Sequence, residues 1–312
     1  MVSKAIEEAF KRHPRPQVPI KPGPSQRLTV PTKVALLQRA IEDDRQRSLT
    51  YRELPENPWE TLIRQGDLVQ GKHVRSICVH QRQLVMVREM AKDTGRRQLE
   101  VLKKLSDHPH ISTIEQSFET ENAIFFQLEY SRYTLEEVLN VHTCLEDLHI
   151  RVIASTIFYA IQHIAKIGMI HNAISISTIR FCSSGKPVLA DFDNFSFATT
   201  EHTANHDLEC LGLVVLECMN GAPKKKLRDL EEVRRLRGSN KTFGLDNGEQ
   251  WSGCKLLVDF LDNLFNFHVP AIAKLQNPHR YVEREPGYGI LIPFLELVPL
   301  ECFALWRAAA AK

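Results

Sequence analysis

Two aspartates separated by one residue, Asp191 and Asp193, are the side chains of this sequence that most clearly invite chemistry. They follow a short apolar run that ends in Leu189 and Ala190. Carboxylate oxygens are the ligands that Mg²⁺ and Ca²⁺ prefer, so the pair could bind a cation. Divalent sites usually need more oxygen ligands than two side chains supply, and we therefore favour a pair of loop acids that are solvated or cap a turn.

A second candidate site combines His202 and His206 with their neighbours Glu201 and Asp207. Zinc sites in proteins take four nitrogen or sulfur ligands, or three with an open position. No further histidine lies close in sequence, and Cys210 is the only nearby thiol. The sequence therefore predicts no zinc site here.

The basic stretch 224–237 could bind an acidic partner, a nuclear-import receptor or nucleic acid. Acidic residues at 229, 231 and 232 interrupt it, which is more typical of a solvated helix or loop. A net charge of +2 over 312 residues also gives no global field for nucleic acid or an anionic membrane.

Composition favours an ordinary globular protein, with 43% hydrophobic and 25% charged residues. No run of about eighteen apolar residues indicates a membrane span, and the charged start Met1 to Arg12 does not resemble a signal peptide. Seven scattered cysteines without a CxxC pair favour reduced thiols. We expect a cytoplasmic protein, with the nucleus as the alternative.

Hydrophobic periodicity predicts the elements that must position these residues. Six prolines between 14 and 31 predict an extended arm, either a linker or a ligand for a proline-binding domain, and a short helix follows over 34–47. Strands are expected over 74–80, 84–90, 111–118 and 123–130, with a helix over 96–105 between the two pairs. A long apolar helix is expected over 148–167. Strands with one helix, followed by helices, predict an α+β protein of two lobes.

Four segments in this order resemble the eukaryotic protein kinases, serine/threonine kinases in particular. They are HPHISTIEQSFETENAIFFQLEY (108–130), HNAISISTI (171–179), LADFD (189–193) and DLECLG (207–212). The resemblance implies a protein-kinase-like two-lobed fold, with an antiparallel sheet plus one helix in the N-lobe and a mainly helical C-lobe. It implies an N-terminal arm over 1–57, an N-lobe over 58–131, a C-lobe over 132–285, and a C-terminal helix that packs on the C-lobe over 286–312.

The same resemblance assigns a nucleotide cleft whose residues depart from the family pattern. Leu128 takes the gatekeeper position, and Glu129 to Ser131 take the hinge. Arg88 replaces the lysine that pairs with phosphates, and Gln98 replaces its glutamate partner, with Glu100 facing away. Met86 replaces the small residue above the base, where it would fill part of the nucleotide slot; packing into the core is the alternative. Only Gly66 and Gly71 lie where the family has a glycine-rich loop.

The catalytic loop is the clearest loss that the resemblance implies. Ala173 takes the position of the catalytic aspartate, and a missing general base costs roughly 10²- to 10⁴-fold in rate. The other positions of the loop are His171, Asn172, Ser175 in place of a lysine, and Thr178 in place of the metal-binding asparagine. Asp191 alone remains as a metal ligand, and Asp193 replaces a glycine. The packing positions are kept, with Leu102, Ile114, His171 and Phe192 predicted to stack above Asp207.

The C-terminal segment 291–306 is apolar and contains Pro293 and Pro299. Proline disrupts helix interiors, so regular helix is expected only after Pro299. We expect this part to pack on the C-lobe, and docking to a partner is the alternative.

The sequence thus predicts a pseudokinase, a kinase-like domain without catalysis that acts as a scaffold or an allosteric partner in signalling. A protein partner is expected, either an active kinase or a proline-binding domain, with no role for a membrane or nucleic acid. No cofactor is required, although Asp191 leaves ATP with Mg²⁺ open. The alternatives are an unconventional ATP-dependent serine/threonine kinase that uses Arg88, Asp191 and Asp193, and a nuclear or nucleic-acid module that uses residues 224–237.

Overall fold

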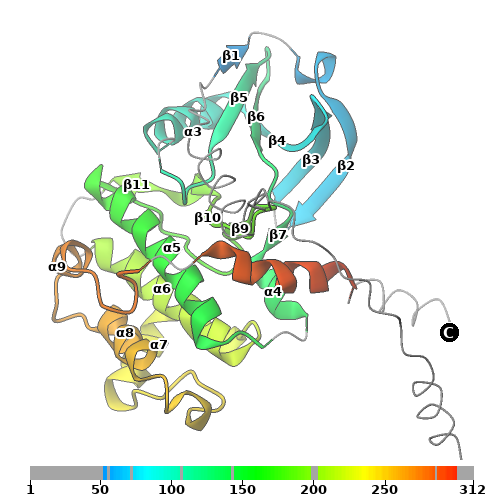
Figure 1. The fold of residues 1–312 in the computed structure, drawn as a ribbon. Helices are drawn as coiled ribbons and strands as arrows, with labels where there is room; N and C mark the ends of the chain where they lie inside the picture. The colour runs from blue at the N-terminus through cyan, green and yellow to red at the C-terminus, as the bar shows by residue number, and fades with distance from the viewer. Residues whose placement is uncertain are drawn as a thin grey trace, which may run out of the picture. The chain divides into compact units, whose positions relative to one another are not determined.

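A computed structural model describes residues 52–54, 57–70, 73–105, 108–141, 144–197, 203–284 and 287–300. All of these residues belong to the unit Leu49–Lys312. The proline-rich stretch 13–31 and the helix expected over 34–47 lie outside them. Strands with one helix come first along the unit and helices follow, which confirms the predicted α+β arrangement of two lobes (Figure 1).

The N-lobe is built on a six-stranded sheet with the order β1-β5-β6-β4-β3-β2. Neighbouring strands are antiparallel except for β1, which runs parallel to β5. The sheet therefore begins before residue 58, within the segment 1–57 that the sequence assigned to the arm, because β1 completes one edge of the sheet. The strands are β1 (Arg52–Leu54), β2 (Ile63–Gln70), β3 (His73–His80), β4 (Gln83–Ala91), β5 (Ile114–Glu119) and β6 (Ala123–Glu129).

The hairpin of β3 and β4, which the sequence predicted, supplies the N-lobe side of the cleft. Its turn residues Gln81 and Arg82 both have positive φ, 46° and 68°. Two left-handed residues form the kind of turn that matches the twist of paired strands. Ile77 pairs with Met86 across the hairpin. Since alternate residues of a strand share a face, Arg75 and Arg88 lie on the same face as this pair.

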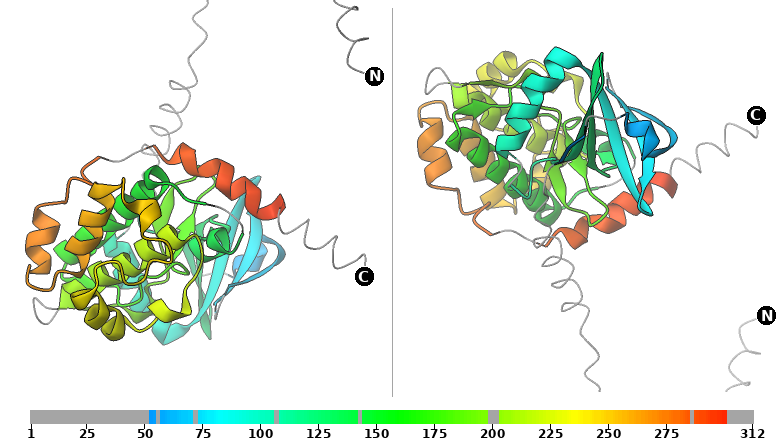
Figure 2. Two further views of the ribbon diagram at one scale, coloured as in Figure 1. Left: turned by 90° about the horizontal axis from the view of Figure 1, so that it is seen from below. Right: turned by 90° about the horizontal axis from the view of Figure 1, so that it is seen from above.

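Helix α3 (Lys92–Leu105) covers one face of the sheet, as the view from above shows (Figure 2). The predicted apolar stripe of Leu99, Leu102 and Leu105 is buried. Close approach is possible because residue 95 is glycine: a Cβ there would lie 2.9 Å from Cβ of Ile124. This packing directs Gln98, on the same side of the helix, toward the cleft.

The C-lobe is mainly helical. Its longest helix, α5 (Asp147–Lys166), confirms the helix expected over 148–167 and is apolar along most of its length. Thr134 and Glu137 form a capping box at the start of α4 (Leu135–Asn140). The other helices are α6 (Thr203–Asn220), α7 (Leu230–Ser239), α8 (Lys255–Phe265) and α9 (Ala271–Gln276).

Short strands and 3₁₀ turns complete the C-lobe and place its loops. One small sheet joins β7 (Tyr133–Thr134), β9 (Ile179–Phe181) and β10 (Pro187–Leu189), and another joins β8 (Met169–Ile170) and β11 (Ser196–Phe197). These strands bracket the loop 171–178 and the segment that contains Asp191. The 3₁₀ turns after the N-lobe are η2 (Phe192–Asn194), η3 (Lys225–Leu227), η4 (Glu249–Trp251) and η5 (Tyr288–Leu291), and η1 (Pro58–Glu60) precedes β2 in the N-lobe.

A single apolar core runs through both lobes. It extends from Met90, Ile124 and the buried face of α3 to the helices α5, α6 and α8. A smaller cluster on the other face of the sheet includes Cys78 and Phe125 and is covered by Leu54 and Leu62. No helix among the described residues is long and apolar enough to cross a membrane.

The C-terminal segment differs from its prediction. Residues 292–300 are helical and contain both Pro293 and Pro299, so the expectation of helix only after Pro299 is wrong. Pro293 is the second residue of this helix, where the first N–H groups have no partner within the helix in any case. Leu295 and Val298 belong to the main core, and Phe294 packs edge-on against His149 of α5. Residues after 300 lie outside the described part of the chain.

Candidate functional site

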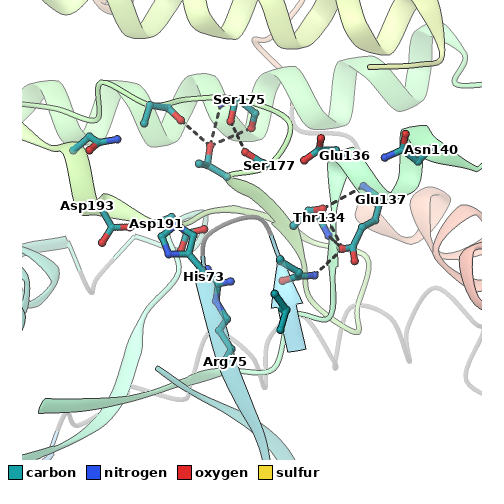
Figure 3. A pocket seen from close by; sticks show the side chains of 15 residues that line it. His73, Arg75, Thr134, Glu136, Glu137, Asn140, Ser175, Ser177, Asp191 and Asp193 are labelled. Carbon is teal, nitrogen blue, oxygen red and sulfur yellow. Dashed lines mark hydrogen bonds and ion pairs between the residues drawn. The ribbon is translucent and has the colours of Figure 1, made fainter. Parts of the chain in front are cut away.

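A cavity of about 420 Å³ lies where the N-lobe strands β2 and β3 face the loops of the C-lobe. Figure 3 shows Asp191, Asp193, His73 and Arg75 on one side of it, with Thr134 and Glu137 on the other. Its remaining walls come from the loop 171–178. The lining residues are Val69, Gln70, His73, Arg75, Thr134, Glu136, Glu137, Asn140, Ala173, Ser175, Ser177, Thr178, Asp191, Asp193 and Asn194.

The loop 171–178 is fixed by the buried Asp207 of α6. Its carboxylate accepts hydrogen bonds from the backbone N–H of His171 at 2.8 Å and of Asn172 at 3.0 Å. Burial raises the pKa of Asp207 above its usual value, and these two donors oppose that rise. The loop is thus anchored to the C-lobe core through its first two residues.

The rest of the loop is held by hydroxyl groups. The Oγ1 of Thr178 donates toward the carbonyl oxygens of Ala173 and Ser175, each at 3.1 Å, and accepts from the N–H of Ser175 at 3.0 Å. Ser175 and Ser177 are joined through their hydroxyls at 2.9 Å. Ala173 contributes only a methyl group to the cavity. The loop therefore presents hydroxyls, and no side chain that accepts a proton readily at neutral pH.

The predicted stack of packing residues is formed. Leu102, Ile114 and Phe192 belong to the main core, and the ring of His171 lies 4.6 Å from that of Phe192. The Nε2 of His171 lies 3.0 Å from the carbonyl oxygen of Ala190. Complete burial lowers the pKa of His171, so the imidazole is neutral at physiological pH.

Asp191 is paired with arginines from the N-lobe. One guanidinium nitrogen of Arg75 on β3 forms a short ion pair with its Oδ1, and both side chains are buried. Arg88 on β4 approaches the same oxygen at 3.5 Å. Asp191 itself has a positive φ of 63°, a left-handed conformation that places its carboxylate at the start of η2. Its negative charge is therefore already neutralised within the chain.

Asp193 lies in a second set of contacts beside the first. Its Oδ1 accepts hydrogen bonds from Arg88 at 2.7 Å and from the amide of Gln98 at 2.6 Å. His73 Nε2 lies 3.5 Å from its other oxygen. Burial alone would raise the pKa of Asp193, but the hydrogen bond and charge of Arg88 hold it below the usual value. His73, Arg75, Arg88, Gln98, Asp191 and Asp193 together form what we call the cleft cluster.

A third arginine, Arg180 of β9, lies against Ser131 and Met86. Its Nε donates to the carbonyl oxygen of Ser131 at 3.1 Å and to the hydroxyl at 3.0 Å, and one terminal nitrogen contacts the same carbonyl more closely. The N–H of Ser131 lies 3.3 Å from Sδ of Met86. Arg180, Met86 and Ser131 are all buried, at 2%, 1% and 3% exposure. Both backbone groups of Ser131 therefore have partners inside the protein.

The positive charge of Arg180 is balanced by Glu137 through the side chain of Gln70, which lies between them. Its second terminal nitrogen donates to the side-chain oxygen of Gln70 at 2.5 Å, and the amide nitrogen of Gln70 donates to Glu137 at 2.7 Å. Burial, together with the nearby charge of Arg75, lowers the pKa of Arg180 to about 10. The guanidinium thus stays charged at neutral pH, and it joins the C-lobe to Gln70 of β2 in the N-lobe.

Comparison with known proteins supplies the family. Residues 68–209 match the family model described as protein kinase domain. A segment of 98 residues is 30% identical to NUAK family SNF1-like kinase 2 of Rattus norvegicus. That alignment covers 31% of this chain and 15% of the rat kinase. Over these residues the chain is similar to protein kinase domains, and its two-lobed α+β structure agrees with that similarity.

The two-lobed structure brings together most of the positions named from the sequence. Met86 pairs with Leu128 across β4 and β6, and both precede Ser131 at the connection to the C-lobe. Glu129 lies 3.9 Å from Lys186. Gln98 is buried near the cleft while Glu100 is exposed, but the amide of Gln98 contacts Asp193 and not Arg88.

The cleft cluster offers a divalent ion an unsuitable set of ligands. Among the described residues, His73, Asp191 and Asp193 form the one group whose ligand atoms lie within 4.8 Å of one another. Arg75 and Arg88 already contact these carboxylates, so a metal ion would face two guanidinium groups. The residues present therefore do not fit Mg²⁺ at this position.

Two other candidate sites are not assembled within the described part of the chain. In the basic stretch, Arg234 pairs with Glu209 and Glu231, Arg235 with Glu232, and Arg237 with Asp262. Lys224 and Lys226 both pair with Asp246. His206 contacts Cys210 at 3.6 Å, and its expected companions Glu201 and His202 lie outside the described residues.

Sequence reasoning missed His73, Arg75 and Arg180. The signal for Arg75 was its spacing, because it alternates with Ile77 on the face of β3 that looks into the cleft. The signal for Arg180 was a charged residue between Ile179 and Phe181 in a short apolar strand. A buried arginine needs partners, and these partners come from segments 49 to 116 residues away along the chain.

Proposed function

We propose that this kinase domain does not transfer phosphate and acts by binding protein, as a scaffold or an allosteric partner in signalling. The observation that carries the proposal is Ala173, a methyl group at the position of the catalytic aspartate, in a loop whose other cavity-facing groups are hydroxyls. A positioned general base contributes roughly 10²- to 10⁴-fold to a rate. The stacked core residues support a rigid domain that has kept its fold without this group.

Three of the four carboxylates that line the cavity are engaged by other groups of the chain. Asp191 and Asp193 are paired with arginines, and Glu137 accepts from the N–H of Thr134 and from Gln70. Glu136 lies beside the loop 171–178, since its backbone N–H donates to the carbonyl oxygen of Ile176 at 3.0 Å, and it faces the same cavity as Ser177 (Figure 3). This arrangement opposes the alternative of an unconventional kinase that works through Arg88, Asp191 and Asp193.

The proposed partner is a protein, either an active kinase or, for the proline-rich stretch, a proline-binding domain. No cofactor is needed for such a role. The described cysteines are free thiols, which supports a reducing compartment, the cytoplasm or the nucleus. The ion pairs along 224–237 oppose a nucleic-acid role, because those cations are already matched by carboxylates.

Phosphotransfer from radiolabelled ATP tests the catalytic half of this proposal. The purified full chain should label neither itself nor general substrates such as casein and myelin basic protein above an enzyme-free blank. Ala173→Asp should remain inactive as well, because the cleft cluster still occupies Asp191. Labelling by the wild type that disappears in Asp191→Asn would contradict the proposal.

The binding half is tested by cross-linking in living cells followed by mass spectrometry. We expect cross-links from the kinase domain to the catalytic domain of another kinase, and from residues 13–31 to a proline-binding domain. A chain that labels substrate, or that forms cross-links only with nucleic acid, would refute a scaffold role.

A further inference from the structure

We propose that the nucleotide cleft of this kinase domain is filled by the chain itself. In this arrangement Arg180 and Met86 occupy the position of a base at the hinge, while Arg75 and Arg88 take the place of a metal ion at Asp191 and Asp193. The two lobes are thereby held together without any ligand. This inference extends the proposed function, on which it rests only for the absence of catalysis.

The base position is occupied by contacts that a nucleotide would have to displace. A base at the hinge needs the free N–H and carbonyl oxygen of that segment. At Ser131 the N–H contacts the sulfur of Met86, and the carbonyl oxygen accepts from Arg180. Displacing Arg180 would leave a buried guanidinium without its acceptors, which is costly in a low-dielectric interior.

The arginines of the cleft cluster lie where a metal ion would bind and supply positive charge at that position. A divalent ion between the phosphates and Asp191 would bring positive charge from outside, but here Arg75 and Arg88 supply it from the N-lobe. Arg88 also contacts Asp193, and Gln98 of α3 donates to the same oxygen. Strands β3 and β4 and helix α3 are thus tied to one short segment of the C-lobe.

The location of the remaining cavity agrees with a cleft in which side chains of the protein occupy both the base position and the metal position. Its lining, among the described residues, includes Arg75, Gln70 and the loop 171–178. Met86, Ser131 and Arg180 are not part of the lining, because their side chains pack directly on one another. Open space therefore remains beside the catalytic loop and not at the hinge, where a base would have to enter.

Binding of a fluorescent nucleotide, MANT-ATP, tests the inference directly. The wild-type full chain should show no saturable binding up to 1 mM, with Mg²⁺ or with EDTA, and no change in melting temperature with ATP. The double variant Arg75→Leu with Arg180→Leu should gain saturable binding that is tighter in Mg²⁺ than in EDTA, because Ser131 loses its contacts with Arg180 and Asp191 keeps only the longer contact with Arg88. Arg132→Leu is the matched control, since Arg132 is exposed beside the same hinge, and it should bind no better than the wild type.

Saturable binding of MgATP by the wild type at micromolar concentration would overturn the inference while leaving the proposed lack of phosphotransfer intact. A double variant that melts cooperatively, and is therefore folded, but binds no nucleotide would also overturn the inference. If the double variant does not fold, hydrogen exchange on the wild type decides the question. The amides of residues 128–134 should then exchange at the same rate with and without 1 mM MgATP, and ligand-dependent protection there would overturn the inference.

Discussion

At the scale of single residues, this kinase-like domain is distinguished by buried charges that neutralise one another. Arg75 and Asp191 are both almost fully buried, and each is separated from its partner by more than a hundred positions in the chain. Asp191 and Arg88 could be picked out from the sequence because they stand at recognisable motif positions. For Arg75 the sequence offered only its spacing with Ile77, which does not show burial, since a charged residue on a strand is ordinarily solvated until a partner buries it.

The Arg75–Asp191 pair predicts a measurable energetic coupling. Asp191→Asn, which suits the left-handed backbone, should lower the free energy of unfolding by about 3 kcal/mol, because it strands a buried guanidinium. Arg75→Met should cost less, since Asp191 keeps Arg88. Urea unfolding of both single variants and the double variant should give a coupling energy above about 1 kcal/mol.

The exposed pair Arg64 and Asp67 provides the control for this cycle. Asp67→Asn should leave the urea midpoint unchanged, because solvent screens that pair. Additive effects of Arg75→Met and Asp191→Asn would show that the two side chains do not stabilise one another.

At the scale of elements, helix α3 and the C-terminal helix show how packing overrides local preference. The helix 292–300 contains two prolines, yet its Leu295 and Val298 are buried in the main core. In α3, Gly95 is unfavourable for helix formation by roughly 1 kcal/mol relative to alanine. It is used nonetheless because the helix must approach Ile124 closely, and this approach brings Gln98 to the cleft cluster.

Alanine substitution of two helical glycines should therefore give opposite results. Gly95→Ala should destabilise the domain in spite of its better helix propensity, because the new Cβ would lie 2.9 Å from the branched Cβ of Ile124. Gly238→Ala in α7 should stabilise the domain by about 0.5–1 kcal/mol, because a Cβ added at residue 238 would meet no packed neighbour within 4 Å. Thermal unfolding of the two variants side by side provides the measurement. Equal stabilisation by both would mean that α3 does not pack as closely as described.

At the scale of the whole molecule, one core spans both lobes, so the described unit should unfold as a cooperative whole. Its stability should depend on pH through three histidines whose pKa values are lowered by burial: His73, His149 and His171. A base with a lowered pKa in the folded state takes up its proton only on unfolding. Its contribution to stability is present above about pH 6.5 and is lost as pH falls toward the folded-state pKa.

His171, which is completely buried, should account for the steepest part of this dependence. The free energy of unfolding should fall by up to about 1.4 kcal/mol per pH unit below pH 6.5 from this residue alone. Asp207 and Glu217, whose pKa values are raised by burial, act in the opposite direction at lower pH, so the comparison must be made between variants. His171→Phe should flatten the slope between pH 5 and 7 in urea unfolding, and His268→Asn, at an exposed position, should not. An unchanged slope in His171→Phe would show that this imidazole does not control the acid response.

The sequence by itself determined the two-lobed α+β fold and the order of its elements, since the strands, the α3 stripe and α5 each carry a local hydrophobic period. It also determined that residue 173, which the kinase resemblance assigns to the catalytic loop, is an alanine and carries only a methyl group. Only the tertiary structure decided what fills the cleft. The contacts that fill the cleft join Arg75, Arg88 and Arg180 to carboxylates and carbonyl oxygens of distant segments. No local sequence pattern predicts such pairings. The same holds for the C-terminal helix, because burial of Leu295 and Val298 against the core outweighs the prolines beside them.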